Sequence, residues 1–120
     1  GEEMTILDFT EEEIKSLNYE FPLWESYELE PGTYPTQVET INTVASPNIL
    51  IVREDVPEKI VYDMTKMLWE NLATLQEIHS ATDSMSIDSA LAGVTVPLHP
   101  GAYRYYEEQD VKIPEHLKIR

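Results

Sequence analysis

The segment 97-PLHPGAYRYYEE-108 gathers the residues of this chain that are most capable of chemistry. His99 could act as a general acid or base, and the carboxylates of Glu107 and Glu108 follow it closely. The same segment could instead dock a last helix, because its prolines stiffen the approach, Gly101 allows a tight turn, and three tyrosines offer rings with hydroxyl groups. We favour docking, with His99 as a structural residue, and keep a small hydrolase as the alternative.

Other catalytic and metal-binding patterns are missing or unspecific. The three histidines stand far apart, unlike the close pairs of a zinc site, and the absence of cysteine excludes thiol nucleophiles and disulfides. No serine lies in a G-x-S-x-G elbow, and the four glycines are too isolated for a phosphate loop. Nothing singles out a glycosidase pair among the 23 acidic residues. We therefore expect no enzyme activity, no metal and no cofactor.

Composition restricts the class of partner. The chain has 120 residues and a net charge of -15, with only eight lysines and arginines scattered along it. Nucleic acids and anionic membrane surfaces require a basic face, so both are disfavoured as partners. No apolar run approaches the roughly 20 residues that a membrane-spanning helix needs.

The first elements are expected near the N-terminus. Residues 4–9 form a mostly apolar run that predicts a short strand, and residues 10–20 predict a helix. Thr10 is a plausible N-cap, and Glu13 stands at the capping-box position three residues later. Glutamates in the first helical turn favour the helix dipole, so this acidic run has a structural explanation.

The next stretch reads as extended chain. Residues 21–47 contain several prolines, and 31-PGT-33 is a turn signal because proline fixes φ and glycine permits unusual backbone angles. The continuous apolar run in 48-NILIVRED-55 predicts a strand that is covered on both faces, as in an α/β sheet.

Helical patterns dominate the second half. Residues 57–79 predict one long amphipathic helix with Pro57 in its first turn and Met64, Met67 and Trp69 in the core. A short helix is expected over 86–93, and a helix from about 102 to 110 follows the extended stretch 94–101. The apolar stripe of the long helix comprises Ile60, Met64, Leu68, Leu72 and Leu75. Strands followed by helices place the chain in the α/β class.

The order of these features resembles the C-terminal part of the TAXI-type solute receptors of TRAP transporters, which are extracytoplasmic binding proteins. The matching segments are 32-GTYP-35, 43-TV-44, 48-NILIVREDVPE-58, 61-VYDMTKMLWEN-71, 97-PLHPGAYRYYEE-108 and 113-IP-114. The PLHPGA block with its tyrosine-rich helix start is the most specific of them. The first segment is usually GTYPG in the family, whereas Thr36 stands here in place of the second glycine.

This resemblance implies the C-terminal portion of a two-lobed periplasmic-binding-protein-like fold of type II, incomplete at this length. Residues 1–42 would finish the second lobe with a strand, a helix and an extended turn segment. Residues 43–53 would form the hinge-crossing strand, and residues 54–120 the helical part that returns to the first lobe. The ligand cleft of such proteins lies between the lobes.

Candidate ligand-binding residues follow from the same resemblance. Hydroxyl and amide groups beside a turn can fix a carboxylate or an amine through directed hydrogen bonds, and an arginine suits a carboxylate. The candidates are Thr33, Tyr34, Gln37, Thr43 and Arg53. The alternatives are a surface turn with a packed tyrosine, and an Arg53 that simply pairs with Glu54 or Asp55.

The resemblance implies a periplasmic or extracytoplasmic receptor that delivers a small organic acid or an amino acid such as glutamate to the membrane permease subunits of an ion-driven secondary transporter. The alternative is an autonomous acidic module that engages a basic protein. If the chain is a fragment, apolar surface made for the missing part should be exposed, which predicts self-association.

Overall fold

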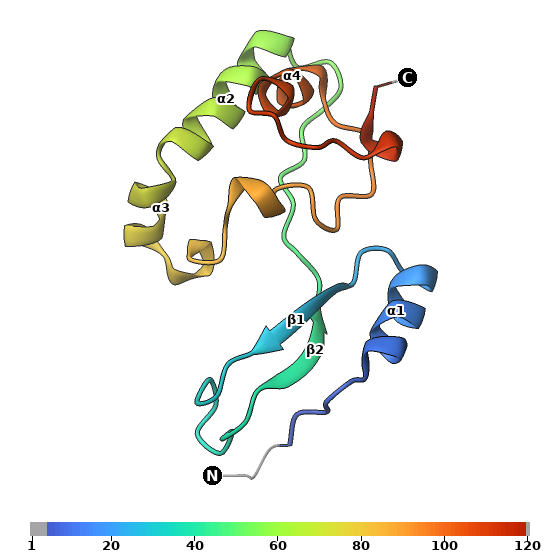
Figure 1. Ribbon diagram of the computed structural model, residues 1–120. Helices are drawn as coiled ribbons and strands as arrows, with labels where there is room; N and C mark the ends of the chain where they lie inside the picture. The colour runs from blue at the N-terminus through green and yellow to red at the C-terminus, as the bar shows by residue number, and fades with distance from the viewer. Residues whose placement is uncertain (1–4, 120) are drawn as a thin grey trace. The chain divides into compact units, whose positions relative to one another are not determined.

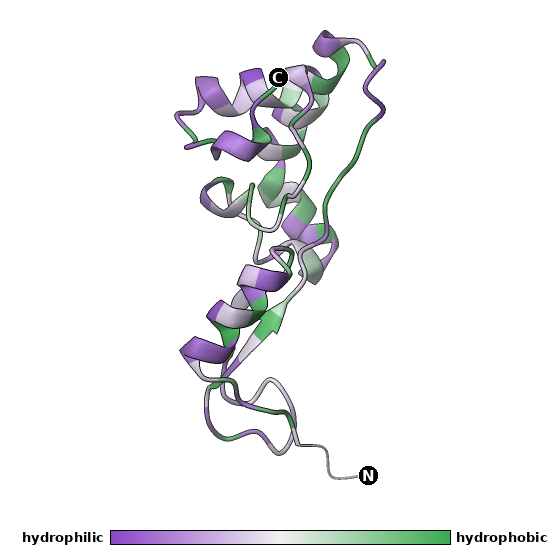
Figure 2. Ribbon diagram, turned by 90° about the vertical axis from the view of Figure 1, so that its right-hand side faces the viewer, coloured by the Kyte–Doolittle hydropathy of each residue, from purple (hydrophilic) through white to green (hydrophobic). Residues whose placement is uncertain are grey.

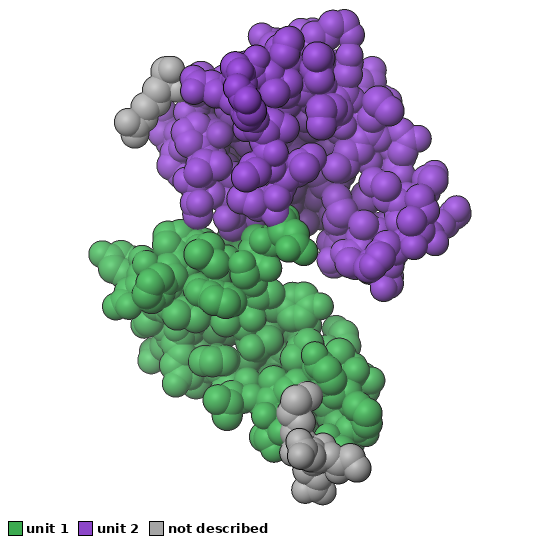
Figure 3. Space-filling model, turned by 180° about the vertical axis from the view of Figure 1, so that it is seen from behind, with its two compact units in different colours: residues 1–48 green, residues 49–120 purple. Residues whose placement is uncertain are grey.

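The computed structural model describes residues 5–119, and the chain divides into two compact units, residues 1–48 and 49–120 (Figures 1 and 3). The first unit holds α1 (Glu11–Glu20), β1 (Glu25–Leu29) and β2 (Ile41–Ala45). The second holds α2 (Glu58–Glu70), α3 (Leu72–Ile78) and α4 (Pro100–Glu108), with short 3-10 turns at Ser80–Thr82, Ile87–Ser89 and Glu115–Leu117. This mixture of helices with a two-stranded sheet is compatible with the expected α/β class. No helix within residues 5–119 is long and apolar enough to cross a membrane.

The helix α1 confirms the prediction for residues 10–20. The Thr10 hydroxyl accepts from the Glu13 backbone N–H at 3.3 Å, and the Glu13 carboxylate accepts from the Thr10 N–H at 2.8 Å. These two bonds lower the pKa of Glu13, with the backbone bond as the larger cause. Ile14 is buried where α1 faces the hairpin, and the Asn18 amide donates to the Trp24 carbonyl at 2.7 Å. The capping box fixes where α1 begins, and the Asn18 bond to Trp24 holds the turn that leads from α1 into β1.

The strands β1 and β2 form an antiparallel hairpin, with Glu25 opposite Ala45 and Leu29 opposite Ile41. The extended character and the turn predicted for residues 21–47 are confirmed by this hairpin and by its loop.

The strand predicted for residues 4–9 does not form. Met4 lies outside the described residues, and residues 5–9 run beside β2 without belonging to the sheet. Two bonds tie them there: the Phe9 N–H donates to the Asn42 carbonyl at 2.8 Å, and the Asp8 carboxylate accepts from the Asn42 N–H at 2.7 Å. Since Asp8 uses its side chain for the second bond, the pairing does not continue as a ladder.

The strand predicted for residues 48–55 is also absent. Residues 48–53 carry no regular secondary structure, and a turn follows in which the Val56 N–H donates to the Arg53 carbonyl. The colouring of Figure 2 shows hydrophobic residues along this segment. A strand requires a partner strand, and none of residues 5–119 pairs with this one.

The long helix predicted for residues 57–79 is split into α2 and α3 by Asn71. The Asn71 side-chain amide donates to the Met67 carbonyl at 2.8 Å, and the Asn71 backbone adopts φ -111° and ψ 20°. An asparagine side chain that bonds local backbone competes with the helical pattern. The short helix predicted for residues 86–93 is likewise reduced to a 3-10 turn.

The buried face of α2 differs from the predicted apolar stripe by one position. Val61 is the buried residue of α2, whereas Ile60, Met64 and Met67 are exposed. The prediction that both methionines pack in the core is therefore wrong. The helix α4 packs against the side of α2 that contains Val61, which turns the neighbouring stripe away from the contact.

Close approach of α4 to α2 depends on Gly101. A Cβ placed on Gly101 would overlap the Glu58 carbonyl oxygen, lie 2.5 Å from the Tyr62 nitrogen and touch the Val61 side chain at 3.0 Å. The predicted helix from 102 to 110 is confirmed with its start two residues earlier, at Pro100. Pro100 suits the first turn because proline fixes φ and the first amides of a helix need no partner.

An aromatic cluster forms the core of this contact. Tyr105 is 4% exposed, and its ring meets that of Tyr62 edge to face at 5.9 Å. Tyr106 is also buried and packs edge to face on both Tyr105 and Trp69. Leu117 is fully buried, and its carbonyl accepts from the Leu98 N–H at 2.9 Å, which ties the C-terminal turn to the approach of α4.

Candidate functional site

The loop between β1 and β2 contains three of the predicted ligand residues. Gly32 adopts φ 82°, which glycine allows without steric cost, and its N–H donates to the Gln37 carbonyl at 2.9 Å. The Thr33 hydroxyl donates to the Glu30 carbonyl at 2.6 Å. The loop is therefore closed by its own hydrogen bonds, and the Thr33 oxygen retains only its capacity to accept.

Gln37 is the internal clamp of this loop. Its amide nitrogen donates to the Leu29 carbonyl at 3.0 Å and to the Glu39 carbonyl at 2.9 Å. Its amide oxygen is buried and accepts no hydrogen bond from any of residues 5–119. A buried acceptor without a donor costs about 1–3 kcal/mol, so this oxygen is suited to a donor from outside the chain, such as a ligand N–H or an ordered water.

The remaining predicted ligand residues are placed differently. Tyr34 is exposed on the loop, and Thr43 lies half-buried in β2 opposite Tyr27. Arg53 belongs to the second unit, where its guanidinium makes two bonds to the Asp55 carboxylate at 2.8 and 2.6 Å. Thr33, Tyr34 and Gln37 are thus brought together, and Arg53 makes the ion pair that the alternative interpretation describes. Their role in ligand binding stays a prediction.

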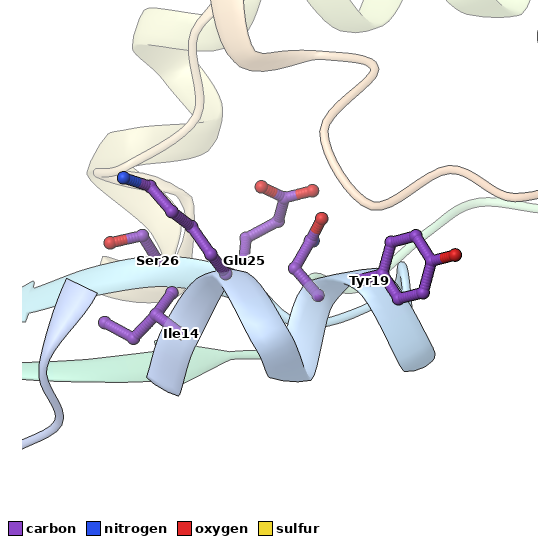
Figure 4. Close-up of a pocket in the computed structure, with 6 residues that line it drawn as sticks. Ile14, Tyr19, Glu25 and Ser26 are labelled. Atoms are coloured by element: carbon purple, nitrogen blue, oxygen red, sulfur yellow. The ribbon is translucent and has the colours of Figure 1, made fainter. Parts of the chain in front are cut away.

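An open depression of about 400 Å³ lies between α1 and β1 in the first unit (Figure 4). Its lining residues are Ile14, Lys15, Asn18, Tyr19, Glu25 and Ser26. Figure 4 shows Tyr19 at the end of α1 and Glu25 and Ser26 on β1, and the Tyr19 side chain is 89% exposed. A ligand there would remain largely in contact with water, whereas ligand sites normally enclose most of the ligand surface. No spacing signal in the sequence pointed to these residues.

His99 has both ring nitrogens engaged. Its Nδ1 accepts from the Gly101 N–H at 3.1 Å, which caps α4, and its Nε2 lies 2.9 Å from the Val56 carbonyl oxygen. Because a carbonyl only accepts and a backbone N–H only donates, these two bonds together require the tautomer of His99 that carries its proton on Nε2. The segment 97–108 therefore holds α4 against α2, which is the docking role that we favoured from the sequence.

Glu108 belongs to a charged network on α2 and α4. Its carboxylate accepts from the Tyr62 hydroxyl at 2.6 Å and from Arg104 at 3.0 Å, and these two bonds lower the pKa of Glu108, with Tyr62 as the larger cause. The hydrogen bond between the Tyr62 hydroxyl and the Glu108 carboxylate also raises the pKa of Tyr62. The Arg104 guanidinium also lies 4.8 Å from the centre of the Tyr62 ring and 3.7 Å from the Glu58 carboxylate. The sequence did not indicate Tyr62 or Arg104.

No group of three or more metal-ligating side chains is assembled within the described part of the chain.

The comparison with known families agrees with a binding role. The model of the NMT1-like family matches residues 1–109 of the 120-residue chain. The match includes the loop with Thr33, Tyr34 and Gln37 and all of α2 and α4. Proteins of this family are extracytoplasmic and solute-binding-like. The chain belongs to the NMT1-like family.

Proposed function

We propose that this chain is part of an extracytoplasmic solute receptor of the TAXI type. The receptor would capture a small organic acid or an amino acid such as glutamate and deliver it to the membrane permease subunits of a TRAP-type secondary transporter. The family match over residues 1–109 supports the solute-binding role. The TAXI type, the solute class and the delivery to a TRAP-type transporter rest on the sequence resemblance described above. Capture and delivery need no covalent chemistry, so the proposed protein is not an enzyme.

The proposed receptor is periplasmic or extracytoplasmic and has a two-lobed fold of type II. Residues 1–42 and 54–120 would contribute to the two lobes, and residues 43–53 would cross between them. In such a receptor, the solute is held in the cleft and the lobes close around it.

The loop of residues 30–37 is proposed to contribute ligand contacts. Gln37 offers a buried amide oxygen without a donor, and the Thr33 oxygen can still accept a hydrogen bond. Both groups suit the ammonium of an amino acid, while the exposed Tyr34 hydroxyl can donate to a carboxylate. Arg53 is occupied by its two bonds to the Asp55 carboxylate. This chemistry favours an amino acid over a plain dicarboxylate.

Calorimetric titration of the complete gene product with L-glutamate and with succinate tests the proposal. We expect glutamate to bind more tightly, and Gln37→Leu to weaken glutamate binding about tenfold, the effect of a hydrogen bond worth about 1.4 kcal/mol.

Gln76→Leu is the matched control, because the Gln76 amide also donates to two backbone carbonyls, those of Thr82 and Asp83, in the second unit. It should leave the affinity unchanged. Equal affinity of both variants and the parent would contradict the assignment of Gln37, and a lack of binding across amino acids and organic acids would contradict the receptor itself.

A further inference from the structure

The start of α2 has no cap of its own. Pro57 is the N-cap residue, and its side chain makes no capping hydrogen bond. The first amides of a helix have no partner within the helix, so an uncapped start frays unless another part of the chain holds it. By contrast, α1 begins with the capping box at Thr10, and α4 begins with the bond from the Gly101 N–H to His99. The start of α2 therefore depends on contacts from outside the helix.

His99 supplies such a contact. Its Nε2 lies 2.9 Å from the carbonyl oxygen of Val56, the residue directly before Pro57, and both His99 and Val56 are half-buried. Gly101, two residues after His99, brings the α4 backbone against the first turn of α2 at Glu58. One imidazole thus caps α4 through Nδ1 and anchors the start of α2 through Nε2.

The connection that leads to Val56 changes character at Arg53. Residues 49–52 form an extended trace between β2 and α2, and their backbone groups make no hydrogen bond within residues 5–119 (Figure 1). From Arg53 onward the chain is closed into a turn, because the Arg53 carbonyl accepts from the Val56 N–H at 3.3 Å and the Asp55 carboxylate binds the Arg53 guanidinium. This turn ends at the carbonyl that the imidazole binds.

We propose that His99 is a latch that fixes the turn of residues 53–56 and the start of α2 to α4, so that the free part of the connection between the two units ends at Val52. The latch depends on bonds within the second unit and needs no solute. Its consequence for binding rests on the proposed receptor function. Lobe closure would be absorbed by the free part of the connection, while the latch keeps Arg53 with the second unit.

Two variants separate the two bonds of the imidazole. In His99→Asn the amide takes the place of Nδ1, so the cap on α4 is kept and the bond to Val56 is lost. In His99→Gln the longer side chain brings its amide to the place of Nε2, so the bond to Val56 is kept and the cap is lost. Amide hydrogen exchange measured by NMR reports on each helix start separately. The Ile60 N–H, which donates to the Pro57 carbonyl, reports on α2, and the Tyr103 N–H, which donates to the His99 carbonyl, reports on α4.

We expect opposite effects in the two variants. His99→Asn should accelerate exchange of the Ile60 amide about tenfold, the effect of losing one hydrogen bond, and leave the Tyr103 amide unchanged. His99→Gln should accelerate the Tyr103 amide and leave Ile60 unchanged. A histidine that only fills space would not produce this reversal. Unchanged exchange of Ile60 in His99→Asn, or equal acceleration of both amides in both variants, would overturn the latch.

Nitrogen relaxation measurements test where the free part of the connection ends. In the parent, backbone order parameters should lie below about 0.6 for residues 49–52 and rise toward about 0.85 from Arg53 onward. In His99→Asn the low values should extend through Val56, whereas in His99→Gln they should end at Val52 as in the parent. Low values that already extend through Val56 in the parent would contradict the proposal. Neither measurement uses a solute, so failure of the latch is distinguished from failure of the receptor, which the titration with L-glutamate tests.

Discussion

The indole N–H of Trp69 donates to the hydroxyl oxygen of Tyr106 across 3.2 Å, and the two rings meet edge to face with their centres 6.4 Å apart. This contact joins α2 to α4. Desolvation of the buried Tyr106 hydroxyl raises its pKa, because burial disfavours the phenolate. The two residues therefore combine ring packing with a polar bond that fixes the register of the helices.

Tyr106→Phe should destabilise the second unit by about 1 kcal/mol, because it keeps the ring and removes one hydrogen bond. Urea unfolding measured by circular dichroism checks this value. Tyr103→Phe is the control, since the Tyr103 hydroxyl makes no hydrogen bond within residues 5–119. Equal stabilities of the two variants would show that the Trp69 bond contributes nothing.

Gly101→Ala should cost stability through steric overlap. The added methyl group would overlap the Glu58 carbonyl and crowd the Tyr62 nitrogen, so α4 must move away from α2, at a cost of at least about 1–3 kcal/mol. Gly32→Ala serves as the comparison, because open space surrounds Gly32 and only its positive φ opposes a side chain, at about 1–2 kcal/mol. Chemical denaturation should show a larger loss of unfolding free energy for Gly101→Ala than for Gly32→Ala. Only Gly101→Ala should also lose the near-ultraviolet circular dichroism signal of the aromatic residues. An intact aromatic signal in that variant would contradict the close-packing role of Gly101.

His99 should tolerate asparagine better than phenylalanine. Asparagine can still accept from the α4 N-terminus, whereas phenylalanine loses the cap, worth about 1 kcal/mol, and leaves the Val56 carbonyl without its donor. Thermal unfolding of His99→Asn, His99→Phe and His116→Phe ranks the three variants. His116→Phe is the comparison for losing one histidine–carbonyl bond, to Val94 at 3.3 Å, without losing a helix cap. Nitrogen NMR of the imidazole should show the proton on Nε2. The opposite tautomer would contradict both assigned bonds.

Acid should remove the contribution of the Glu108 carboxylate to the free energy of unfolding. Its folded-state pKa lies below the ordinary value of about 4.3, so its stabilising effect is complete above that value and is lost as pH falls through the folded pKa. Glu108→Gln should therefore be less stable than the parent at pH 7 and should approach it at low pH. Glu107→Gln controls for net charge, because no hydrogen bond or ion pair of the Glu107 carboxylate occurs in the described chain. A stability difference for Glu108→Gln that does not change between pH 7 and pH 2 would contradict this linkage.

Local signals predicted those elements that need only nearby residues. The capping box at Thr10 and the turn at Gly32 are determined within one or two turns of chain, and both are present. The last helix is also present, but it starts at Pro100, two residues before the predicted start. The break at Asn71 escaped prediction because asparagine is compatible with a helix until its side chain bonds the Met67 carbonyl. The strand predicted for residues 48–55 is absent for a different reason. Apolar composition indicates that a segment can form a strand, but it does not show whether a partner strand is present.

Features that depend on distant contacts were less predictable. The buried face of α2 is set by the approach of Gly101, which is remote in sequence from Val61. The sequence identified the loop of residues 30–37 through a family resemblance, but it gave no sign that the Gln37 amide would hold two carbonyls and leave its oxygen unpaired. Arg53 is the opposite example, because its guanidinium is bound by the Asp55 carboxylate only two residues away, a pairing that the sequence alone could suggest.

Native mass spectrometry of the complete gene product, purified without added ligand and compared with this 120-residue chain, tests the receptor role most directly. We predict that the complete product retains a small amino acid or organic acid, which exact mass and exchange with added L-glutamate would identify. A complete product that emerges empty and does not take up any solute of these classes, while the chain instead binds a basic protein, would contradict the receptor and support the acidic interaction module.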